Sequence, residues 1–146
     1  MRPSASLPSR MPDFVLVQGT ANNPPGTSLV PMSAITQSVT VLNLTLGLGV
    51  NNNLDLGDAT FVRLTPNAGG SSITGVANGF MGRRILFRNL AVPAVGISFN
   101  VSDVNSLPQN RIISPTGAAV NIGTAESIEL FYDATSLIWL IININT

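Results

Sequence analysis

The chain has 146 residues, enough for one domain with a sizeable core, and it carries little charge. Only 10% of the residues are charged and 45% are hydrophobic; seven Arg balance seven acidic residues, and the chain has no Lys, His or Cys. The lack of His and Cys excludes imidazole bases, thiolate nucleophiles, Cys/His zinc sites and disulfides. Because a net charge of zero promotes association, we expect a subunit of an assembly. The zero net charge and the scattered arginines also argue against a nucleic-acid-binding protein, which needs a basic patch to neutralise phosphates.

The first residues show no targeting signal. The segment 1–14 lacks the apolar stretch of a signal peptide, and the longest strictly apolar run, 137–142, is too short to cross a bilayer. We therefore expect a protein that is used without secretion and without a membrane partner.

Residues 1–34 read as an extended arm. Six prolines interrupt this segment, at positions 3, 8, 12, 24, 25 and 31, and proline at that spacing prevents helices and regular sheet ladders. The apolar side chains of Met11, Phe14, Val15 and Val17 have no fold of their own to bury them. We expect them to bind a partner, with 14–17 able to add as a strand to a neighbour's sheet. The alternative is a partly disordered terminus.

Residues 35–146 read as a β-domain, because apolar and polar residues alternate with a period of two. Gly, Asn and Pro turns separate the runs, and no run has a helical pattern. The segments 127–133 and 137–144 form a hairpin in this reading, and 47–58 is a turn. Short strands at this spacing are typical of a β-sandwich or jelly roll. The predicted strands are 38–46, 59–65, 71–76, 83–90, 94–101, 111–113, a short one near 120–122, 127–133 and 137–144.

Several segments from residue 60 onward resemble a repeated β-domain of tailed-phage virion proteins, found in capsid decoration proteins, head fibres and tail fibres. The most specific parts are the turn NRIISPTG and a hairpin that runs from Tyr-Asp to Trp. The matching positions are Ile73-Thr74-Gly75, Gly82 with Arg83 and Arg84, Asn110 to Ile113, Pro115-Thr116-Gly117, Tyr132-Asp133 and Trp139. The resemblance implies an all-β module that is usually assembled as a homotrimer.

The sequence departs from the family pattern at two places. Leu140 follows the Trp where the family often has a charged residue, and 102–109 replaces a long polar loop. These departures affect which surface is exposed and leave the implied fold intact.

The motif residues also have structural explanations of their own. Pro115 fixes φ and Gly117 allows a positive φ, so that with Arg111 they form a structural turn. Asp133 can cap the hairpin by accepting hydrogen bonds from backbone amides. The alternative is that Tyr132 and Trp139 form an aromatic platform for a sugar.

The carboxylates offer no convincing acid/base pair. Glu126 and Glu129 are an odd number of residues apart on one predicted strand, so they face opposite sides and cannot serve together as in a glycosidase. The loop with Asp55 and Asp58 is rich in oxygen ligands and could bind calcium, but it lacks the alternating ligands of an EF-hand, and an ordinary loop is the preferred reading. We therefore assign no catalytic residue, metal or cofactor.

The only basic cluster is formed by Arg83, Arg84 and Arg88. The side chains of Arg84 and Arg88 share one strand face, and the planar guanidinium group suits ion pairs between subunits. We take Arg84, Arg88 and Trp139 as candidates for the trimer interface. Ordinary surface arginines are the alternative.

These observations predict a structural virion protein and not an enzyme. The first hypothesis is a capsid decoration, or cement, protein on the capsid surface, made in the host cytoplasm. Its arm would clamp neighbouring subunits of the major capsid protein, and burial of apolar surface would stabilise the head. The alternative is a head-fibre or tail-fibre module that binds a host surface glycan.

Overall fold

The computed structural model describes residues 14–16, 29–31 and 39–146. The chain separates into two units, Met1–Ser38 and Val39–Thr146. In the first unit, β1 (Phe14–Leu16) pairs with β2 (Leu29–Pro31) as two antiparallel strands. The backbone of Phe14 and Val15 therefore pairs within the chain's own first unit. Met11 and Val17 lie outside the described residues.

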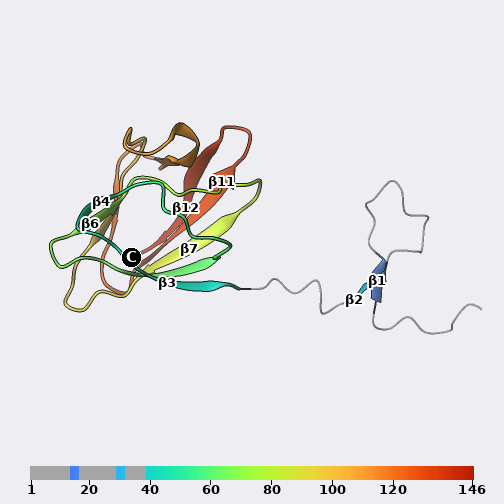
Figure 1. Ribbon diagram of the computed structural model, residues 1–146, viewed down its shortest axis with the longest axis horizontal. Coiled ribbons are helices and arrows are strands. Elements are labelled where there is room, and N and C mark those ends of the chain that lie inside the picture. The colour runs from blue at the N-terminus through green and yellow to red at the C-terminus, as the bar shows by residue number, and fades with distance from the viewer. Residues whose placement is uncertain (1–13, 17–28, 32–38) are drawn as a thin grey trace, which may run out of the picture. The chain divides into compact units, whose positions relative to one another are not determined.

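The second unit, which we call the body, consists of two sheets (Figure 1). In Figure 1 the strands of the smaller sheet lie at the left of the body and those of the larger sheet at the right. The larger sheet has six strands in the order β3 (Val41–Thr45), β5 (Phe61–Thr65), β7 (Arg84–Asn89), β11 (Ser127–Asp133), β12 (Ile138–Asn145) and β9 (Ile112–Ile113). The smaller sheet has four strands in the order β10 (Val120–Ile122), β8 (Ile97–Phe99), β6 (Ser71–Ile73) and β4 (Gly49–Asn51).

The first part of the body is a short β-solenoid. Each of three successive turns places one strand in each sheet: β3 with β4, then β5 with β6, then β7 with β8. Strands of successive turns are parallel, so that Val41 pairs with Phe61 and Phe61 pairs with Leu86. The same stacking occurs in the smaller sheet, where Gly49 pairs with Ser71 and Ser71 with Ile97.

The all-β class predicted from the sequence is therefore correct, but the jelly-roll or sandwich body is wrong. A jelly roll is built from antiparallel strands, whereas β3, β5 and β7 are mutually parallel, as are β4, β6 and β8. Each turn returns to its starting position after roughly 20 to 25 residues, which is the spacing of a solenoid repeat. Alternating apolar residues predict strands, but they do not tell whether a neighbouring strand is parallel or antiparallel.

Antiparallel strands close one end of the solenoid. In the larger sheet, β11 pairs antiparallel with β7 and forms a hairpin with β12, which confirms the predicted 127–133/137–144 hairpin. In the smaller sheet, β10 pairs antiparallel with β8. The chain therefore stops stacking parallel turns after β8, and the strand that follows the solenoid in each sheet runs in the opposite direction. In the larger sheet β12 reverses the direction again, and β9 pairs parallel with β12 at the edge.

The core lies between the two sheets. On β7 the side chains alternate between solvent and core, and Ile85 and Phe87 are completely buried. The ring of Phe87 meets the edge of Phe99 from the smaller sheet, with centroids 5.5 Å apart, so this pair connects the two layers. Burial of such a side chain stabilises the fold by about 1.5–3 kcal/mol.

The turn predicted at 47–58 contains a strand that the sequence did not reveal. Within it, β4 pairs with β6, and the side chain of Asn51 holds the corner between β3 and β4. The amide of Asn51 donates to the carbonyls of Gly47, Gly49 and Ser72. A run of asparagines is typical of loops, because these side chains compete for backbone groups, and here one of them supports a strand instead.

Among the described residues, the structure has no helix with the length and hydropathy needed to cross a bilayer.

Gly79 tests how closely the hairpin packs on the solenoid. A Cβ atom at this position would lie 2.2 Å from ring atoms of Tyr132, a distance that requires the ring or the backbone to move. We expect Gly79→Ala to lower the free energy of unfolding by about 1–3 kcal/mol, as overpacking does. At Gly96 a Cβ would make an ordinary 3.7 Å contact, so Gly96→Ala is the control and should have little effect. Thermal denaturation of both variants measures the difference, and equal melting temperatures would contradict the predicted packing.

Candidate functional site

Two of the motif residues, Tyr132 and Trp139, meet at Arg83, which lies just before β7. Its side chain is 4% exposed, and its guanidinium donates to the carbonyls of Asn78, Gly57 and Ala59. The rings of Phe80 and Trp139 lie 5.5 and 5.9 Å from the guanidinium carbon, within the range of a cation–π contact. Burial lowers the pKa of Arg83, and the negative charges of Asp55 and Asp58 oppose that shift. Arg83 therefore joins two loops to the C-terminal hairpin through a buried charge.

Trp139 belongs to the same cluster and is wholly enclosed by its own chain. Its indole N–H donates to the carbonyl of Val76 at 2.8 Å, and its ring meets the edge of Tyr132 with centroids 5.1 Å apart. The prediction that Trp139 lies at a trimer interface is therefore wrong, because its side chain has no surface to offer a partner. For the same reason Tyr132 and Trp139 do not form an exposed platform for a sugar.

The predicted turn around Pro115 has the geometry that its residues favour. The amide of Gly117 donates to the carbonyl of Ser114 at 3.1 Å, and Gly117 has a φ of 71°, which glycine adopts without strain. Arg111 reaches back from this segment and donates through Nε to the carbonyl of Ser106 at 3.1 Å. These residues fix the path of the chain between the two sheets.

A partly buried polar network that the sequence did not indicate holds the loop before this turn. The side-chain oxygen of Asn53 accepts from the amide of Leu107 and from the side chain of Asn110, both at 2.8 Å. The hydroxyls of Thr74 and Ser106 lie 2.8 Å apart in the same region. These residue types are common in solvated loops, so no pattern in the sequence distinguishes them from surface residues.

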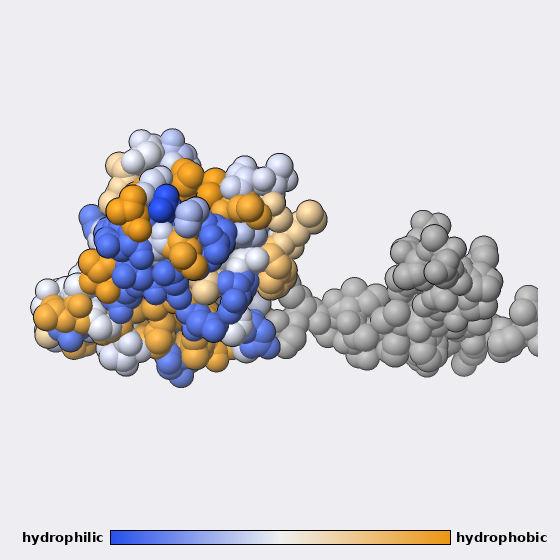
Figure 2. All heavy atoms as spheres, turned by 45° about the horizontal axis from the view of Figure 1, so that its top comes forward, coloured by the Kyte–Doolittle hydropathy of each residue, from blue (hydrophilic) through white to orange (hydrophobic). Residues whose placement is uncertain are grey.

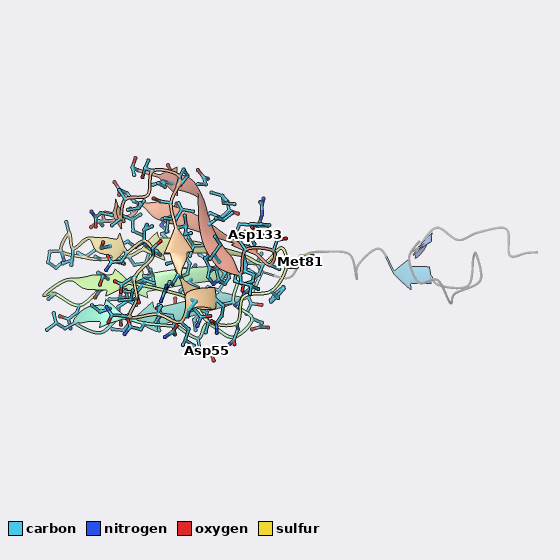
Figure 3. The ribbon with its side chains drawn as sticks, turned by 90° about the horizontal axis from the view of Figure 1, so that it is seen from above. Asp55, Met81 and Asp133 are labelled. Carbon is cyan, nitrogen blue, oxygen red and sulfur yellow. The ribbon has the colours of Figure 1, made fainter. Side chains whose placement is uncertain are left out.

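The aspartates also have structural partners. Asp133 accepts from the amide of Thr135 and the hydroxyl of Ser136 at the tip of the hairpin, which is the capping role expected of it. Asp55 accepts from the amide of Gly57 and the side chain of Asn78, both at 2.9 Å. Figure 3 labels both residues at different places on the body. Within the part of the chain that the structure describes, no group of three acidic side chains gathers as a metal site would require.

The two glutamates are close in sequence but have different bonding partners. Glu126 accepts from the amide of Gly123, and Glu129 lies 3.5 Å from Nη1 of Arg84. Neither carboxylate faces the other across a cavity in these contacts, and each is engaged by a nearby donor. This arrangement agrees with a structural role for both.

Arg84 and Arg88 lie on the outer face of β7, as their alternation predicts. Arg84 pairs with Glu129 of its own chain and also lies over the ring of Phe131. Arg88 is next to Arg63 of β5 in the parallel register, and both side chains are exposed. Their contact with another subunit stays a prediction.

The surface of the body mixes hydrophobic and polar side chains, as Figure 2 shows for one face. An open hollow of about 400 Å³ lies between the loop 102–111 and residues 136–138. Arg111 is the charged residue in its lining, and no carboxylate joins it there. The hollow therefore lacks the pair of carboxylates that glycoside hydrolysis requires.

Comparisons with protein-family models, with curated proteins and with solved structures found no match to this chain.

Replacing Arg83 should unfold the cluster, while replacing its neighbour should not. Arg83→Met leaves three carbonyls without their donor, and we expect a loss of about 2–4 kcal/mol in the free energy of unfolding. Arg84→Met is the matched control: its side chain is 60% exposed and its one ion pair is long, so a loss below about 1 kcal/mol is expected. Chemical denaturation measures both. A loss for Arg84→Met that equals that for Arg83→Met would show that Arg83 has no special role.

The hairpin cap should weaken in acid. Hydrogen bonds from the Ser136 hydroxyl and the Thr135 amide lower the pKa of Asp133 below its ordinary value. Because the folded pKa is depressed, this contribution to stability is present above the unfolded-state pKa and is lost as pH falls through the folded value. We expect the Asp133 carboxyl carbon to titrate below the ordinary aspartate range in an NMR experiment, and Asp133→Asn to flatten the loss of melting temperature below about pH 4. A midpoint at or above the ordinary value would refute the cap.

Proposed function

We propose that this chain is a structural subunit of a bacteriophage virion, acting as a capsid decoration protein. The observation that carries the proposal is the use of the motif residues. The positions shared with the virion β-domain pattern, above all Arg83, Gly117, Asp133 and Trp139, are engaged in holding the body together. A module in which these residues stabilise the fold is suited to a mechanical role.

The composition supports a function based on surface contact. The chain has no His or Cys, its net charge is zero, and nearly half of its residues are hydrophobic. Such a protein gains free energy by burying apolar surface against a neighbour, at about 25 cal/mol per Å². Many copies, each joining adjacent subunits of the major capsid protein, would together resist expansion of the head.

The N-terminal arm is the proposed contact with the capsid. It is a unit separate from the body, and its short strands pair with each other. An isolated pair of strands is only marginally stable in water, so the arm gains from a partner's surface. The body then serves as the part that associates with other copies, and the resemblance implies a trimer.

A fibre module that binds a host glycan is the competing function. That reading needs exposed aromatic side chains, and the two aromatics best placed by the sequence, Tyr132 and Trp139, are buried. The structure therefore gives the glycan-binding reading less support than the sequence did.

The copy number in purified virions distinguishes the two functions. A decoration protein is expected at a number comparable to that of the major capsid protein, whereas a fibre module occurs in far fewer copies. Quantitative mass spectrometry of virions measures this ratio. A low ratio, together with binding of the purified chain on a glycan array, would replace the decoration function by the fibre function.

Substitutions in the arm test how the protein is held on the head. We expect Phe14→Asp combined with Val15→Asp to abolish binding to isolated capsids, because charged side chains cannot be buried against an apolar partner, and to leave the association of bodies intact. The control is Val104→Asp, which changes an exposed loop residue of the body. Cosedimentation with capsids measures occupancy, and full occupancy by the arm variant would exclude the arm as the contact.

A further inference from the structure

The two ends of the solenoid differ. At one end, β11 and β10 are antiparallel to the last solenoid strands, β12 and β9 follow β11 in the larger sheet, and a bridge between Ile112 of β9 and Val101 links this end to the chain that follows β8. At the other end, β3 and β4 are the outermost strands of their sheets, and each pairs with a described strand on one side only. We call this pair of edges the open end. Solenoids usually need a cap at each terminus, because the last turn otherwise leaves its core edge and its backbone groups exposed.

The open end has apolar side chains on the surface. Val39, Val41, Leu48 and Val50 are between 46% and 68% exposed, and all four lie on or beside β3 and β4. On the core side, Leu42 and Leu44 of β3 are only partly buried, whereas Val62 and Leu64, their register partners on β5, are completely buried. Among the described residues, the first turn therefore lacks a neighbour that the second turn has.

The open end also lacks the usual protection of an edge strand. Natural sheets shield their edges with charged side chains, prolines or bulges. Residues 39–54 contain no charged residue and no proline. A charged residue near the two-fold axis would oppose pairing with an identical copy, because it would face the same charge on that copy. The neutral run permits that pairing.

The open end is held in one conformation before any partner arrives. The Asn51 side chain bonds to the corner between β3 and β4, and the hydroxyl of Ser71 donates to the carbonyl of Gly47 at 2.8 Å. A preformed edge loses little conformational entropy when a partner binds.

We propose that a second copy of this chain covers the open end by two-fold pairing. A two-fold axis perpendicular to the strands, passing through both sheets, places β3 antiparallel to β3 of the second copy and β4 antiparallel to its β4. Both sheets and the core between them then continue from one copy into the next. One contact satisfies the backbone groups of two edges and covers the partly buried core side of both first turns, where Leu42 and Leu44 lie. This pairing uses a surface other than the arm and does not depend on the virion role.

The mass of the particle in solution gives the first test. The full-length chain should form an assembly with an even number of chains, which is six where the bodies also form the proposed trimer; light scattering after gel filtration measures the mass. Val41→Lys combined with Val50→Lys places like charges across the two-fold axis, and we expect it to halve the mass while the melting temperature of the body stays within a few degrees of the parent's. The control is Val104→Lys, in which the altered residue is exposed on a loop away from β3 and β4.

Cross-linking gives the second test and needs no disruptive change. The chain contains no cysteine, so a single introduced cysteine reports one position. We would compare Val41→Cys, Asn43→Cys and Thr45→Cys on the outer side of β3 with Thr65→Cys, which is next to Thr45 but on β5. Antiparallel self-pairing brings one position on β3 close to its own counterpart. We therefore expect rapid disulfide dimers from one β3 variant and slow ones from Thr65→Cys.

Three results would overturn the proposal. A parent mass equal to one chain or to an odd number of chains excludes two-fold pairing. A mass that the double lysine variant leaves unchanged shows that the contact is elsewhere. Cross-linking of all three β3 variants at no more than the rate of Thr65→Cys shows that the edges do not meet. None of these results bears on the copy number in virions, so this pairing and the decoration function can fail separately.

Discussion

A single buried arginine connects parts of the body that lie far apart in the sequence. The guanidinium of Arg83 donates to carbonyls of two loops that precede it in sequence and lies against the ring of Trp139, which comes from the last strand. A buried charge without such partners would cost several kcal/mol, so these carbonyls and rings must stay in place for the charge to be tolerated. The solenoid and the hairpin are therefore fixed to each other by the requirement to solvate one cation.

The stacking of turns explains why few polar side chains of this chain are available for catalysis or ligand binding. In a solenoid the inward residues of each turn pack on the turns before and after, and the corners need Gly and Asn to change direction. Asn51, Asn53 and Asn110 are used in this way, with their side chains replacing backbone donors and acceptors at the corners. Polar residues that would form a site in an enzyme here complete the hydrogen bonding of loops.

Most of the strands could be predicted from the sequence, with β4 as an exception, and their arrangement could not. Alternation predicts β5, β7 and β11 within a few residues, because one face of each is buried and the other is not. The strand β12 is predicted instead by a run that is apolar on both faces. The parallel register was not visible, since it depends on the period between turns and not on the pattern within one strand. Trp139 was assigned to an interface because an apolar strand can be buried by its own chain or by a partner, and the pattern is the same for both.

The antiparallel strands at one end of the solenoid also limit how far such a molecule can grow. A stack of parallel turns that was open at both ends could join head to tail without limit and would form filaments. Here β10 and β11 reverse the strand direction and end the repeat on that side. Under the proposed two-fold pairing, stacking continues only from the other side and stops after one partner has been added, so the same edges that favour joining would produce a finite particle and not a fibril.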